Sequence, residues 1–103
     1  MIAVITGDII NSRALTNQLS WLQPLKALLS EWGAAPTCWE IYRGDSFQLE
    51  MKDPLMALGA AMRIKAVIKA VQPEEEDKRI SPIDVRMAIG IGVKEYTAER
   101  ISE

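Results

Sequence analysis

Two strand-like runs joined by a very short turn constrain the fold of this chain more than any other feature. The runs are "CWEIYR" (38–43) and "SFQLEM" (46–51), and Gly44-Asp45 lies between them. The second run alternates apolar with polar residues, as a strand with one buried face does. Glycine and aspartate are typical residues of a tight hairpin turn. The middle of the chain is therefore predicted to be an antiparallel hairpin in which Gly44 permits the turn.

Further strand-like and helix-like segments flank this hairpin. "IAVIT" is a branched apolar run that predicts a strand buried on both faces, and it ends at Gly7-Asp8. One helix is indicated by a one-sided apolar stripe, and another by an aspartate–proline start. The predicted elements outside the hairpin are a strand at 2–6, a helix at 17–32, a helix at 53–71 and a strand at 84–93.

The order strand, helix, strand, strand, helix, strand favours one α+β domain over residues 1–103, either as a whole protein or as the N-terminal part of a longer one. Right-handed strand–helix–strand connections fold this order into a ferredoxin-like βαββαβ sandwich, a four-stranded antiparallel sheet with two helices on one face. The first and third strands would be central, adjacent and antiparallel. We therefore expect Asp8 and Asp45 to meet at the same edge of the sheet.

Composition narrows the chemistry that such a domain can perform. The chain has no histidine and a single cysteine, Cys38, so histidine-based triads, an intramolecular disulfide and a four-cysteine zinc site are excluded. The net charge of −2 and the pI of about 5.2 make nucleic-acid binding an unfavoured role. Neither a secretory signal nor a membrane-spanning run is apparent, so a cytoplasmic location is expected.

Each of the two Gly-Asp pairs follows or joins predicted strands, and each has two interpretations. Alone, Asp8 or Asp45 is a turn or cap residue. Together, two carboxylates about 4 Å apart repel by roughly 1–4 kcal/mol, and a divalent cation compensates that repulsion. Magnesium takes hard oxygen ligands, typically one or two carboxylates together with phosphates. The pair is thus a candidate Mg²⁺ site.

These residues also carry a resemblance to a known family. "AVITGDIINSR", "IYRGDSFQLEM" and "DVRMAIGIGV" resemble the first strand, the Gly-Asp hairpin and the fourth strand of class III nucleotide cyclases. The bacterial SatD-like family has the same layout, and the similarity covers about residues 2–95. The resemblance implies a nucleotide cyclase-like domain that binds a nucleoside triphosphate with Mg²⁺, in a longer chain or as a homodimer.

The resemblance also implies roles for individual residues. Asp8, Asp45 and the backbone carbonyl of Ile9 would hold the metal. The segment that follows, formed by Ile10, Asn11, Ser12 and Arg13, would receive the triphosphate, since backbone donors are free where a chain turns into a helix.

The chain departs from the cyclase pattern at three places. Asn11 replaces a glycine, and the purine-selecting position falls on Ile41, while Glu40 beside it should face the opposite side of the strand. The Asn and Arg that stabilise the cyclase transition state belong downstream of the fourth strand, past or near Glu103. The domain is therefore expected to be catalytically incomplete as this chain.

Other interpretations remain open at this point. A non-catalytic ferredoxin-like module for regulation or self-association fits the same order of elements. Arg13 is either a phosphate contact or a surface residue, and Arg86 points either to the site or to solvent. Integrin binding through Arg43-Gly44-Asp45 is not expected, because the tripeptide lies in a tight hairpin and no export signal is present.

Overall fold

The computed structural model describes residues 1–11, 19–42, 44–71 and 83–93. Its elements, in chain order, are β1 (Ile2–Ile10), α1 (Leu19–Leu29), β2 (Trp39–Tyr42), β3 (Ser46–Met51), the short 3₁₀ helix η2 (Pro54–Met56), α2 (Ala57–Lys69) and β4 (Asp84–Gly92). Ser12, Arg13 and Arg43, together with the segments 72–82 and 94–103, lie outside the described residues.

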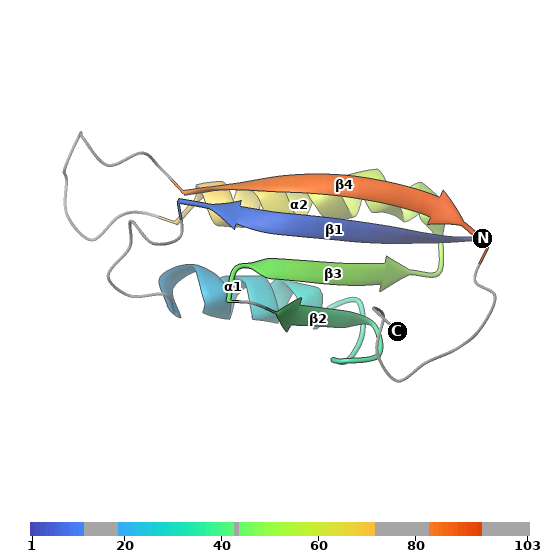
Figure 1. Cartoon of the computed structure of the whole chain (residues 1–103), viewed down its shortest axis with the longest axis horizontal. Coiled ribbons are helices and arrows are strands. Elements are labelled where there is room, and N and C mark those ends of the chain that lie inside the picture. The colour runs from blue at the N-terminus through green and yellow to red at the C-terminus, as the bar shows by residue number, and fades with distance from the viewer. Residues whose placement is uncertain (12–18, 43, 72–82, 94–103) are drawn as a thin grey trace.

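The four strands form one antiparallel sheet in the order β2-β3-β1-β4. β1 and β3 are central and adjacent, and their register places Ala3 opposite Met51 at one end and Asp8 opposite Ser46 at the other. Both helices lie on the same side of the sheet (Figure 1). The predicted α+β architecture is confirmed, and its topology is compatible with a ferredoxin-like arrangement.

The core lies between the sheet and the helices. Alternate residues of the two central strands enter it, including the fully buried Ile5, Phe47 and Leu49. From the helices, Trp21 and Ile64 are among the side chains that cover them, with 1% and 0% exposure. No helix of the described part of the chain covers the other face of the sheet, which is its open face (Figure 1).

β1 differs from the strand predicted at 2–6. It continues through Gly7-Asp8 to Ile10, because it stays paired with β3 as far as Asp8 and with β4 as far as Ile10. Gly7 is not a strand end: a Cβ built there would lie 2.4 Å from the Phe47 ring, so the missing side chain makes room for that ring. The expectation that this strand is buried on both faces is also wrong, since Thr6 and Asp8 are exposed.

Both helices end close to their predicted positions, and the predicted start of the first, at residue 17, lies outside the described residues. Asp53 caps the second helical segment as expected, because its Oδ1 accepts a hydrogen bond from the Leu55 N–H at 3.0 Å, although the first turn is 3₁₀. The first helix ends at Leu29, three residues before the predicted Trp32, and contains Pro24 in its interior. No helix among the described residues is long and apolar enough to cross a membrane.

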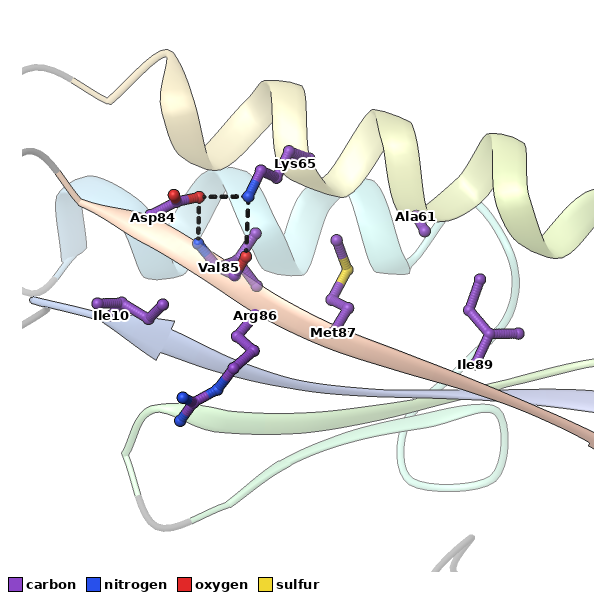
Figure 2. A pocket seen from close by; sticks show the side chains of 8 residues that line it. All are labelled: Ile10, Ala61, Lys65, Asp84, Val85, Arg86, Met87 and Ile89. Carbon is purple, nitrogen blue, oxygen red and sulfur yellow. Dashed lines mark hydrogen bonds and ion pairs between the residues drawn. The ribbon is translucent and has the colours of Figure 1, made fainter.

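A cluster of charges ties α2 to the start of β4. Lys65 Nζ lies 2.8 Å from Asp84 Oδ1 (Figure 2). Lys69 Nζ lies 3.8 Å from Asp84 Oδ2. The Val85 N–H donates to the same Oδ1 at 2.7 Å. The hydrogen bond from Lys65, followed by the one from Val85, holds the pKa of Asp84 below its ordinary value of 3.8.

Replacing Lys65 with methionine should therefore raise the pKa of Asp84 toward 3.8, and Lys69→Met should raise it less. A carboxyl whose pKa is lowered by folding stabilises the fold above its ordinary pKa, and that contribution is lost as pH falls through the lowered value. NMR titration of the Asp84 carboxyl carbon measures the shift directly. An unchanged titration midpoint in Lys65→Met would contradict the assignment.

Candidate functional site

Asp8 and Asp45 do meet at one end of the sheet. Asp8 lies near the end of β1, and Asp45 is the last residue of the turn before β3. The Ile9 N–H donates a 2.8 Å hydrogen bond to the Asp45 carbonyl, which joins the end of β1 directly to the hairpin turn. Gly44 has a φ of +82°, a conformation that glycine adopts without strain.

Ser46 fixes the Asp8 side chain. Its hydroxyl donates to Asp8 Oδ1 at 2.6 Å, a contact between residues 38 positions apart in the chain. Asp8 and Ser46 are cross-strand partners, and the alternation of an antiparallel ladder makes theirs the narrower kind of pair, in which side chains lie closest. A carboxylate accepts several hydrogen bonds or metal contacts, so the Asp8 oxygens keep capacity for a ligand.

The backbone of Ile9 also faces this site. In an antiparallel ladder the N–H and C=O of one residue point toward the same neighbouring strand. Because the Ile9 N–H bonds to Asp45, the Ile9 carbonyl also points toward the hairpin. The side chain of Ile9 is buried in the core at 4% exposure, so only its backbone is available here.

The oxygen donors at this end suit Mg²⁺. Two carboxylates and one carbonyl are hard ligands, and Mg²⁺ usually completes its shell with water and the phosphates of its substrate. Among the described residues there is no group of three or more His, Cys, Asp or Glu side chains that would form an all-protein cage. Two carboxylates and one carbonyl would leave the remaining positions of a Mg²⁺ shell to water or to a ligand.

The chain turns sharply just after this site. Ile10 is the last residue of β1 and pairs with Asp84, so the turn begins at Asn11. Asn11 has a φ of +63°, a left-handed conformation that glycine adopts freely and asparagine tolerates better than most residues. Asparagine at position 11 is thus compatible with the positive φ of this bend.

Arg86 lies on the open face of the sheet and is exposed. It pairs with Asp8 across β1 and β4. Figure 2 shows its side chain leaving β4 on the side away from α2, whereas Met87 points toward α2. With Tyr42 opposite Ser46, a row of four residues crosses the sheet, namely Tyr42, Ser46, Asp8 and Arg86.

Sequence reasoning missed Ser46 and Tyr42 as members of this row. Its prediction that Glu40 and Ile41 face opposite sides is confirmed: Glu40 pairs with Gln48 on the open face, whereas Ile41 pairs with Phe47 and packs against the core. Ile41 therefore does not present its side chain to a ligand on the open face.

A hollow beside β4 does not include the carboxylate pair. A hollow of about 490 Å³ lies between α2 and β4, and Lys65, Asp84, Arg86 and Met87 are among the residues that line it. Neither Asp8 nor Asp45 lines this hollow.

The fold is that of a small α+β domain, and Asp8 and Asp45 lie at one end of its sheet. A comparison of the chain with models of protein families matches none of them, and a search among curated proteins likewise finds no match.

Proposed function

We propose that this chain is a Mg²⁺-dependent nucleotide-binding domain related to the nucleotide cyclases and similar in layout to the SatD-like family. Asp8 and Asp45 hold the metal with the Ile9 carbonyl, and the segment 10–13 receives the triphosphate. The observation that carries the proposal is the Ile9–Asp45 hydrogen bond of 2.8 Å, which brings both Gly-Asp pairs to one sheet end.

When bound, Mg²⁺ would neutralise phosphate charge and orient the α-phosphate for attack by a hydroxyl, the reaction type of the cyclases. The chain's own residues bind and orient: the carboxylates fix the metal, and Ser46 holds Asp8 in place. Phosphoryl chemistry depends on electrostatic stabilisation of the transition state. The downstream Asn–Arg pair that supplies it in cyclases would have to come from elsewhere in a longer chain or from a second copy.

A thermal-stability screen tests the proposal. A ligand that binds only the folded chain stabilises the fold by about 2.7 kcal/mol when its free concentration is 100 times its Kd. In a domain of this size each 1 kcal/mol raises Tm by roughly 4–8 °C. We expect Mg²⁺ with a purine or pyrimidine triphosphate to raise Tm more than either component alone. No shift with any nucleotide would contradict the proposal.

The exposed apolar side chains of β4 favour a second candidate, a self-association module without catalysis. β4 is an edge strand of the described sheet, and residues 87–93, "MAIGIGV", carry no charge. Ile91 in β4 is 60% exposed, and Val93, just after the strand, is 75% exposed. Natural edge strands usually carry charges that prevent pairing with another chain. Absence of any nucleotide shift, together with concentration-dependent elution from a sizing column, would favour this function.

A further inference from the structure

Arg86 is the positively charged member of the row that crosses the open face. In this row Asp8 has the hydroxyl residues Ser46 and Tyr42 on one side and Arg86 on the other. Asp8 and Arg86 are both exposed, whereas Ser46 and Tyr42 are half-buried. Arg86 is the only cation of this row, and it is the immediate cross-strand neighbour of the predicted metal ligand Asp8.

A purely structural role for Arg86 would be a cross-strand ion pair with Asp8. Such exposed pairs contribute only about 0.2–1 kcal/mol. Within the described part of the chain, however, no ion pair involves Arg86, and the described hydrogen bond of Asp8 comes from Ser46 on the opposite side. By contrast, Lys65 and Lys69 on the helix side are both engaged by Asp84. The guanidinium of Arg86 is therefore directed at the open face with its donors available.

The charge of Arg86 matters once the carboxylate pair is filled. Two carboxylates and one Mg²⁺ leave no net charge at the sheet end. The permanently charged guanidinium of Arg86 then makes the filled site positive, which favours an anionic ligand. Guanidinium presents a planar fork of donors that matches phosphate oxygens.

We propose that Arg86 binds a phosphate group of the ligand whose metal ion is held by Asp8 and Asp45, above the open face of the sheet. This inference rests on the proposed function and extends it, because it adds a phosphate contact on β4 to the turn at residues 10–13. The ligand of the site would then be a metal-bound polyphosphate and not a metal ion alone.

The test compares two variants that each lose one positive charge. Arg86→Gln removes the proposed phosphate contact, and Lys52→Gln removes an exposed charge beyond Met51, at the other end of β3. Binding of Mn²⁺ alone, and of inorganic triphosphate with Mn²⁺, is measured by calorimetry. Hydrogen bonds between charged partners are worth about 1.5–3 kcal/mol, so Arg86→Gln should weaken triphosphate binding by roughly 10-fold to more than 100-fold. It should leave the affinity for Mn²⁺ alone equal or higher, and Lys52→Gln should match wild type in both.

The outcomes separate this inference from the proposed function. If wild type and Arg86→Gln bind triphosphate with Mn²⁺ equally well, the role of Arg86 is wrong and the metal site stands. If Arg86→Gln loses Mn²⁺ alone as well, Arg86 supports the carboxylates rather than the phosphate, and the inference is overturned. If wild type binds neither probe, both proposals fail. Arg86→Lys should recover part of the lost affinity, because it restores the charge without the planar fork.

Discussion

Asp8→Ala and Asp45→Ala are each expected to abolish Mg²⁺-dependent nucleotide binding. Either change removes one of two carboxylates that the fold brings to the same sheet end through the Ile9–Asp45 hydrogen bond. Loss of an outer-sphere partner already costs roughly 10–100-fold at metal sites, so loss of a direct ligand should cost more. Calorimetric titration of Mg²⁺ with nucleoside triphosphate into wild type and both variants measures the effect.

Asp53→Ala provides the matched control for these variants. It removes the same charge from an exposed aspartate, but Asp53 lies after the far end of β3 and caps η2. Loss of an N-cap typically costs about 1 kcal/mol of stability, and no effect on binding is expected. Equal nucleotide affinity in wild type, Asp8→Ala and Asp45→Ala would rule out the carboxylate pair as the metal site.

Gly7→Ala should be the most disruptive small substitution in β1. An added Cβ would lie 2.4 Å from two ring atoms of Phe47 and 3.2 Å from Met87 Cγ, and Phe47 is fully buried. The ring has to move or the strands have to separate. Overpacking of this kind typically costs about 1–3 kcal/mol. Urea denaturation of the variant should show this loss in the free energy of unfolding.

Gly59→Ala is the control for the glycine substitution. Gly59 lies inside α2 with no atom within 4 Å of a Cβ built there. Alanine in a helix interior is favoured over glycine by about 0.5–1 kcal/mol, so this variant should gain stability. The double variant Gly7→Ala, Phe47→Leu should recover part of the free energy of unfolding that Gly7→Ala loses, because leucine at position 47 leaves room for the added methyl group. Wild-type stability in Gly7→Ala would show that the strand accommodates the methyl group.

The order of helices and strands could be predicted because the spacing of apolar residues in each segment is clear in the sequence. The alternation of Phe47, Leu49 and Met51 and the Asp53-Pro54 start both predicted structures that are present. The length of β1 could not be predicted, because Gly7-Asp8 has the local signature of a turn. The strand continues there because β3 and β4 pair with it on both sides and the Phe47 ring occupies the space above Gly7.

For the candidate site, the sequence could predict only those neighbours that the order of the strands brings together. Central, antiparallel β1 and β3 suffice to bring Asp8 near Asp45. The partners of Asp8 depend on the exact register, which sets Ser46 and Arg86 opposite it. A shift of one residue would turn Arg86 to the core face. Its orientation therefore stayed open until the pairing of β1 with β4 was known.

The central claim is that a divalent cation binds between Asp8 and Asp45, and paramagnetic broadening by Mn²⁺ in NMR spectra tests it most directly. With substoichiometric Mn²⁺ and a nucleoside triphosphate, the amide signals of Asp8, Ile9, Asp45 and Ser46 should broaden first. The same titration of Asp8→Ala should leave these four signals sharp. Broadening that begins instead at the acidic run "PEEEDK" (73–78), or that is the same in wild type and Asp8→Ala, would contradict the account.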